Sequence, residues 1–174
     1  DLEGTEMHLT ALLEIDAQDM PAIDALVHLY RDQHNTAGLV DMLLSKAPLV
    51  DDEHEGNALF AEAGSLCATA LEAPERAIEI YEALHQRDRD GQVALDALEV
   101  LYHRVSSWER LVDVYRQKIA RREDLDQRKH IAAQMAGIQA TQLEAIDDAI
   151  QTWRTVLSWD DVDVHAMREL DTLM

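Results

Sequence analysis

Apolar residues recur at helical spacing in several segments of the chain. Ala22, Leu26 and Leu29 lie three or four residues apart, and Leu98 and Leu101 repeat that spacing further along. Positions three and four apart share one face of an α-helix, so each set predicts an amphipathic helix with one buried face. We therefore expect Leu98 and Leu101 to be buried where their helix meets its neighbours.

These two segments belong to a repeat with a period of 72 residues. The matched positions include Tyr30 and Tyr102, Leu39 and Leu111, Lys46 and Lys118, and Ala77 and Ala149. A fixed period of apolar positions is typical of stacked repeats, in which each unit buries its apolar face on its neighbour. Because helix-hairpin repeats are about 34 to 40 residues long, one period predicts two hairpins, or four helices.

Prolines and polar residues predict where the helices begin and end. Asp19 or Met20 is expected to cap a helix with Pro21 at its first helical position, and Pro48 is expected to end the next helix. Ser106 and Glu109 have the spacing of a capping box at the start of a helix. The charged segments 49–56 and 121–128 are interpreted as solvated turns. The next helices are expected over residues 57–71, 74–88, 129–143 and 147–160.

The repeat also predicts the organisation of the chain. We expect a single helical-repeat domain over residues 1–174, in which 1–18 is the end of a preceding unit. Two full units are expected at 19–90 and 91–162, and 163–174 is expected to start a third. Because both ends cut a unit, the chain is interpreted as a fragment of a longer array.

The hairpin over residues 57–88 resembles the tetratricopeptide repeat (TPR) family. Its first helix has small residues where the family has Leu-Gly. Its second helix has Ala, an apolar residue and an aromatic residue, which is similar to the family's later Ala and Tyr or Phe. The first copy has Ala63, Gly64, Ala77, Ile78, Tyr81 and Leu84, and the second has Ala136, Ala149, Ile150 and Trp153. The resemblance implies an all-α fold, an α-solenoid of stacked antiparallel hairpins in a right-handed superhelix.

Several positions depart from the TPR pattern. The family's helix-ending proline is missing near Arg89, and Phe60 or Ala132 stands in place of its early Trp. Val27 and Glu99 stand where a small residue is expected. The motifs are degenerate over almost the whole chain, so HEAT-type and other helical repeats stay open beside a TPR-like solenoid.

Charge narrows the classes of partner. The net charge of −20 argues against nucleic acid, because binding phosphates needs clustered Lys and Arg, and it disfavours anionic membrane surfaces. The single Cys67 cannot form an internal disulfide, so nothing implies an oxidising compartment. We expect a soluble protein, with the cytoplasm favoured, and Cys67 to be a buried structural thiol.

Motifs for chemistry are missing from the sequence. It contains no HExxH, no cysteine pair and no glycine-rich phosphate loop, so we expect no catalytic, metal or cofactor site. The aromatic residues Tyr30, Tyr102, Tyr115, Trp108 and Trp153 lie on apolar stripes and are interpreted as core. Trp159 follows such a stripe and is expected to pack at a helix end.

The TPR resemblance implies a partner-binding surface, because in that family the first helix of each hairpin lines the concave groove. The side chains opposite the apolar stripes of these helices form what we call the polar stripe. It comprises Asp24, His28, Arg31, Glu62, Ser65, Thr69, Asp96, Val100, His103, Gln134 and Thr141. Its acidic members predict a protein or peptide partner rich in Lys or Arg, although an ordinary solvated helix face has the same pattern.

Three functional hypotheses follow. The first is a non-catalytic scaffold that binds a peptide or protein segment on its concave face. The second is a structural or regulatory spacer array within a larger multidomain protein. The third is a helical enzyme whose carboxylates and histidines converge on folding, which a cleft of mutually contacting ionisable groups would favour. The sequence leaves the oligomeric state open.

Overall fold

The computed structural model describes residues 2–174, and within them every regular element is an α-helix. The helices are α1 (Leu2–Ile15), α2 (Met20–Asp32), α3 (Thr36–Lys46), α4 (Glu53–Thr69), α5 (Pro74–Arg87), α6 (Gln92–Arg104), α7 (Trp108–Arg121), α8 (Leu125–Thr141), α9 (Ile146–Trp159) and α10 (Val164–Leu173). The all-α class that the apolar spacing predicts is confirmed.

The helix starts recur with the period of the sequence. Helix α2 starts at Met20 and α6 starts at Gln92, which is 92 − 20 = 72 residues later. The same difference separates the starts of α3 and α7, of α4 and α8, of α5 and α9, of α1 and α5, and of α6 and α10. Matching apolar positions therefore produce matching helices.

Aspartate residues begin four of these helices. The carboxylate of Asp19 accepts a hydrogen bond from the Ala22 amide at 3.0 Å, so Asp19 is the cap of the two residues that the sequence left open, and Pro21 is the second residue of α2. Asp52, Asp124 and Asp163 occupy the same capping position at α4, α8 and α10. Each carboxylate satisfies an amide that has no partner within its helix, and its negative charge also favours the helix N-terminus.

Three local predictions from the sequence are wrong. The segments 49–56 and 121–128 are not turns throughout, because the caps Asp52 and Asp124 start α4 and α8 at Glu53 and Leu125. Ser106 and Glu109 do not form a capping box, since α7 starts at Trp108 and its cap, Ser107, makes no side-chain hydrogen bond. Ser106 instead has φ = 56° and turns the chain after α6.

The turns repeat as well as the helices. His34 has φ = 56° and Ser106, 72 positions later, also has φ = 56°, while Glu72 and Glu144 have 50° and 52°. The left-handed residue lets a backbone amide beyond the helix donate a hydrogen bond to one of the last carbonyl groups of that helix. The Ser107 amide, for example, donates to the Tyr102 carbonyl oxygen at 2.8 Å. These turns hold each hairpin in one geometry.

One difference between the copies follows from a single residue. Helix α3 ends at Lys46, whereas α7 continues to Arg121. Pro48 stands in the first copy where the second has Ala120. Proline cannot donate the backbone hydrogen bond that a helix interior needs, so α3 ends early as predicted.

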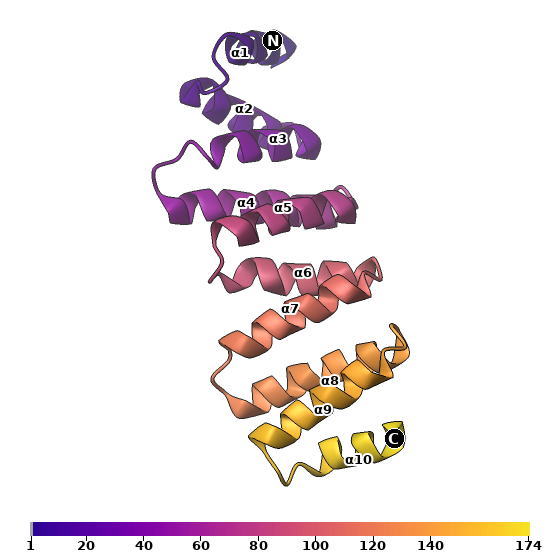
Figure 1. The fold of residues 1–174 in the computed structure, drawn as a ribbon. Helices are drawn as coiled ribbons and strands as arrows, with labels where there is room; N and C mark the ends of the chain where they lie inside the picture. The colour runs from indigo at the N-terminus through magenta and orange to yellow at the C-terminus, as the bar shows by residue number, and fades with distance from the viewer. Residues whose placement is uncertain (1) are drawn as a thin grey trace. The chain divides into compact units, whose positions relative to one another are not determined.

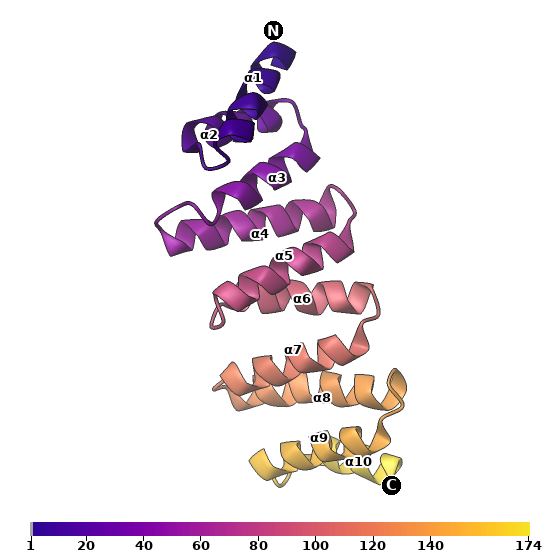
Figure 2. The same ribbon diagram turned by 45° about the horizontal axis from the view of Figure 1, so that its top comes forward.

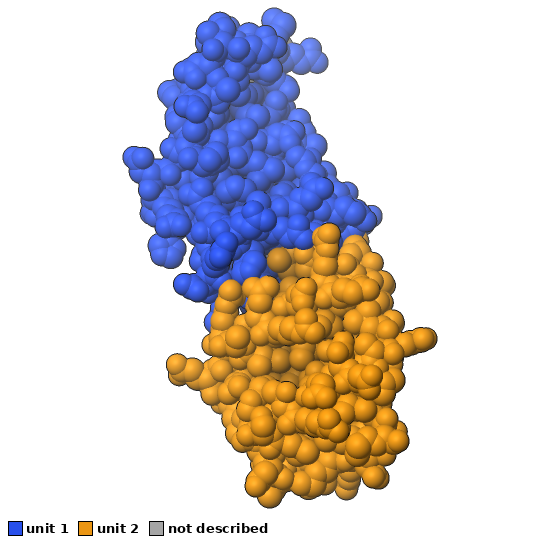
Figure 3. All heavy atoms as spheres, in the orientation of Figure 1, with its two compact units in different colours: residues 1–97 blue, residues 98–174 orange. Residues whose placement is uncertain are grey.

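The chain divides into two compact units, residues 1–97 and 98–174 (Figure 3). In the first unit each helix from α1 to α5 packs on the next, and in the second α7 to α10 do the same (Figures 1 and 2). Consecutive helices joined by short turns run in opposite directions, so each unit is a stack of antiparallel hairpins. This confirms the hairpin architecture; the handedness of a superhelix stays a prediction.

The core consists of the predicted apolar stripes. Leu98 is 3% exposed and Leu101 is 4% exposed, which confirms their burial. The rings of Tyr30, Tyr102, Tyr115 and Trp153 are buried too, while Trp108 and Trp159 are half-buried. Gly64 faces the ring of Tyr81, and a Cβ atom at Gly64 would lie 2.7 Å from that ring. The small residue of the TPR-like motif therefore permits close helix contact within the α4/α5 hairpin.

Candidate partner-binding surface

The polar stripe lies on the first helix of each hairpin and has no buried member. Its residues belong to α2, α4, α6 and α8, and all are exposed except Asp24 and Glu62, which are half-buried. The buried residues of these helices, such as Leu26 and Ala63, occupy other faces. The side chains are thus available to solvent; whether they bind a partner stays a prediction.

In the first unit an ion pair joins two members of the stripe. The guanidinium of Arg31 on α2 lies 2.7 Å from the Glu62 carboxylate on α4. Asp24 is paired with Lys46 of α3 at 2.8 Å. The structure therefore brings Arg31 and Glu62 together across two first helices, and part of the acidic charge of the stripe is balanced within the chain.

Two threonines of the stripe have hydroxyl groups that bond to their own helices. Thr69 donates to the carbonyl oxygen of Ser65 at 2.7 Å, and Thr141 donates to that of Gly137 at 2.7 Å. Each hydroxyl keeps acceptor capacity toward solvent but has used its single proton. These positions are therefore suited to accept a hydrogen bond rather than to donate one.

Two members of the stripe in the second unit, Val100 and His103, have different surroundings. Val100 has 67% of its surface exposed. The ring of His103 meets Trp108 of α7 edge to face, with centroids 5.3 Å apart. His103 therefore has a defined orientation, whereas Val100 presents free apolar surface.

Gln134 lines a recess of about 440 Å³ between α6, α7 and α8. Glu99 and Lys118 form an ion pair at its wall, with side chains that are 26% and 11% exposed. Burial raises the pKa of the neighbouring Tyr115 hydroxyl to about 12, and the charge of Glu99 and a hydrogen bond to it add to the shift. Glu99, a departure from the TPR pattern, thus ties α6 to α7.

A second group of charges that the sequence did not reveal lies at the α9–α10 turn. The Lys129 ammonium of α8 is 2.7 Å from the Asp160 carboxylate and 2.5 Å from that of Asp163. Hydrogen bonds from Lys129 lower the pKa of Asp160 and of Asp163, and both carboxyls raise that of Lys129. In the first copy Asn57 and Asp88 make the corresponding link at 3.4 Å.

Low pH should weaken the ion pairs of Lys129 with Asp160 and Asp163. The pKa values of Asp160 and Asp163 are lower in the folded chain than in the unfolded chain, so their contribution to stability is present above about pH 4 and is lost as pH falls through the folded values. Replacing Lys129 with Gln should flatten this part of the pH profile. Urea unfolding of both chains from neutral pH to acid measures it, and parallel profiles would contradict the assignment.

Cys67 is fully buried, as expected of a structural thiol. Burial raises the pKa of the Cys67 thiol; the charge of Arg76 opposes the shift, and that of Asp41 supports it. A raised thiol pKa keeps the group protonated at neutral pH, and the protonated form is a poor nucleophile.

In the part of the chain that the structure describes, no group of three or more His, Cys, Asp or Glu side chains is placed to hold a metal ion. Within residues 2–174 we also find no helix with the length and apolar character that a membrane span needs.

Comparison with known proteins gives structural likeness without a sequence match. No family model matches the sequence, and no curated protein matches it. Among solved structures, TTC0263, a thermophilic TPR protein of Thermus thermophilus, is similar over 99% of this chain and 90% of its own, with 11% identity and a TM-score of 0.41. The helices of residues 2–174, each packed on its neighbour within its unit, fit a TPR-like repeat protein.

Proposed function

We propose that the chain is a non-catalytic scaffold that binds a peptide or protein segment along the polar stripe. The observation that carries the proposal is that the stripe recurs on successive first helices and has no buried member. Helical repeats generally serve as protein-interaction scaffolds, because stacked helices present side chains at regular intervals along an extended surface.

The chemistry of the stripe favours a segment rich in Lys or Arg. Asp24, Glu62 and Asp96 lie on it, and the whole chain carries a net charge of −20. The pairs that Asp24 and Glu62 make with Lys46 and Arg31 are partly solvent-exposed, and such pairs contribute only about 0 to 1 kcal/mol. A basic residue of a partner can therefore replace Lys46 or Arg31 in these ion pairs at a small cost in free energy.

A charge-neutral variant tests this proposal. Peptides selected on the intact chain from a random displayed library provide the ligands, and the variant combines Asp24→Asn, Glu62→Gln and Asp96→Asn. Loss of three charge contacts should weaken binding roughly tenfold, and added salt should weaken the parent more than the variant.

The matched control removes three exposed acids from second helices: Glu75→Gln, Glu79→Gln and Asp147→Asn on α5 and α9. It changes the net charge by the same amount but leaves the stripe intact. We expect it to bind within about twofold of the parent, since distant exposed charges are screened. Equal binding by both triple variants would contradict the proposal and favour a spacer array without a ligand on this face.

A further inference from the structure

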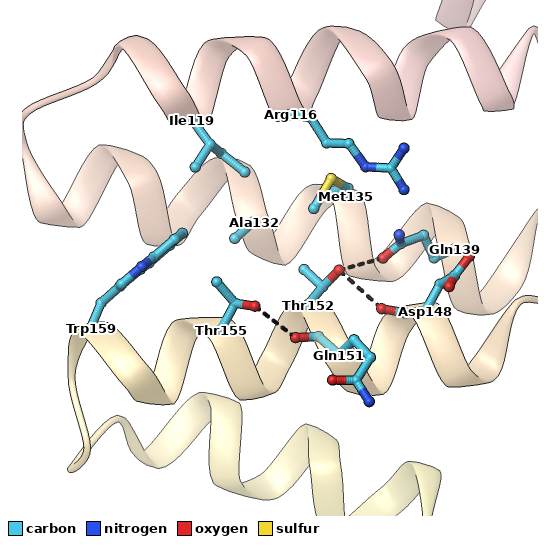
Figure 4. Close-up of a pocket in the computed structure, with 10 residues that line it drawn as sticks. All are labelled: Arg116, Ile119, Ala132, Met135, Gln139, Asp148, Gln151, Thr152, Thr155 and Trp159. Atoms are coloured by element: carbon cyan, nitrogen blue, oxygen red, sulfur yellow. Dashed lines mark hydrogen bonds between the residues drawn. The ribbon is translucent and has the colours of Figure 1, made fainter.

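A cavity of about 310 Å³ lies between α7, α8 and α9 within the second unit (Figure 4). No residue of the polar stripe lines it: on α8 its wall is made by Ala132, Met135 and Gln139. Its size is at the lower end of small-molecule sites, which are about 300 to 1,000 Å³ and combine an apolar lining with a few polar groups. It is thus a second candidate site, independent of the proposed scaffold surface.

Three residues of this wall differ from their counterparts in the first copy by being smaller or more polar. The pairs are Phe60 and Ala132, Cys67 and Gln139, and Ile80 and Thr152. Ala132 lacks the ring of Phe60, whereas Met135 is larger than its counterpart Ala63, and the other two exchanges place hydrogen-bonding groups in the wall.

Gln139 and Thr152 are buried polar residues whose hydrogen-bonding capacity is only partly used. Their exposed fractions are 2% and 7%. The Thr152 hydroxyl lies 2.7 Å from Gln139 Oε1 and 3.0 Å from the carbonyl oxygen of Asp148, and its single proton serves one of these acceptors at a time. When the proton serves the Asp148 carbonyl, Gln139 Oε1 is left to accept from another donor.

The amide nitrogen of Gln139 supplies the complementary donor. In Figure 4 it is turned away from Thr152, toward the side of the cavity where Arg116 lies. Among the described residues none accepts a hydrogen bond from this Nε2 group. The group faces the open cavity, so an acceptor that enters there can take its hydrogen bond.

The opposite end of the cavity is apolar. Ile119, Ala132 and Trp159 line it, and the outer side of the Trp159 ring is covered by the Arg128 guanidinium, 4.1 Å from the ring centroid. This contact fixes the indole plane as a wall. An aromatic or branched apolar group fits beside it.

We propose that this cavity binds an uncharged small molecule that carries an amide group and one compact apolar group. The amide carbonyl accepts from Gln139 Nε2, the amide N–H donates to the spare acceptor beside Thr152, and the apolar group lies against Trp159. An uncharged ligand suits the rim, where the cation of Arg116 and the anion of Asp148 are both present. A free anion is also disfavoured by the net charge of −20.

The test uses 3-phenylpropionamide as probe and the indole N–H signal of Trp159 in the intact chain as readout, with Trp159→Phe to assign the signal. We expect a saturable shift of Trp159 and no shift of Trp108. Propionamide, which lacks the ring, and 3-phenylpropionate, which is charged, should each bind at least about tenfold more weakly. No saturable shift with the amide, or equal binding of either analogue, would overturn the proposal.

Two variants locate the binding. Ala132→Phe restores the residue of the first copy and should abolish the shift while the Trp108 signal keeps its folded position. Arg154→Leu changes an exposed residue of α9 that does not line the cavity and should leave binding unchanged. Unchanged binding by a folded Ala132→Phe chain, or an equal loss in both variants, would place the ligand elsewhere.

Discussion

Replacing Leu98 with Ala is expected to lower the free energy of unfolding by about 2 to 5 kcal/mol. The side chain is 3% exposed and belongs to the apolar stripe of α6. The change removes buried methyl groups and leaves a cavity that the surrounding helices fill only in part. Urea unfolding followed by circular dichroism measures the loss.

Val100→Ala is the matched control for this prediction. Val100 lies on the same helix, two positions away, and is 67% exposed. Its truncation should change the free energy of unfolding by less than about 0.5 kcal/mol, as expected for a surface substitution. Similar losses in the two variants would mean that the buried face of α6 has been assigned wrongly.

Adding one methyl group at Gly64 is expected to destabilise the chain by about 1 to 2 kcal/mol. The new Cβ would lie 2.7 Å from the ring of Tyr81, which is 7% exposed and donates its hydroxyl to the Ala61 carbonyl at 3.2 Å. The ring must move, and overpacking of this kind costs about 1 to 3 kcal/mol. The better helix propensity of Ala returns up to about 1 kcal/mol.

Gly137→Ala is the opposite case within a helix of the same type. A Cβ at Gly137 has no neighbour within 4 Å, so only the gain in helix propensity remains. We expect this variant to be more stable than the parent by roughly 0.5 to 1 kcal/mol, measured by the same unfolding experiment. A stabilised Gly64→Ala chain would contradict the close contact of α4 with Tyr81.

The sequence predicted the helices well because their apolar spacing repeats. The period of 72 recurs in the helix starts, and Pro48 ends α3 as expected. The first turns of α4 and α8 were missed because charged residues were interpreted as turns, although Asp52 and Asp124 cap them. The prediction of a capping box at Ser106 was wrong because the spacing of Ser106 and Glu109 in the sequence does not reveal that Ser106 adopts φ = 56°.

Sites were harder to predict, because they depend on residues that meet only in the folded chain. Lys129 reaches Asp160 and Asp163 across more than thirty positions, and no local motif marks that ion pair. The cavity beside Gln139 did leave a trace in the sequence. A comparison of the two copies position by position shows Ala132, Gln139 and Thr152 in its wall where the first copy has Phe60, Cys67 and Ile80.

Hydrogen exchange with and without a selected basic peptide tests the proposed recognition surface most directly. If the polar stripe binds the segment, amide exchange should slow in α2, α4, α6 and α8, with the largest effect around Arg31 and Glu62. The second helices α3, α5, α7 and α9 should change little. Slower exchange confined to those second helices would contradict the proposal that the first helices carry recognition.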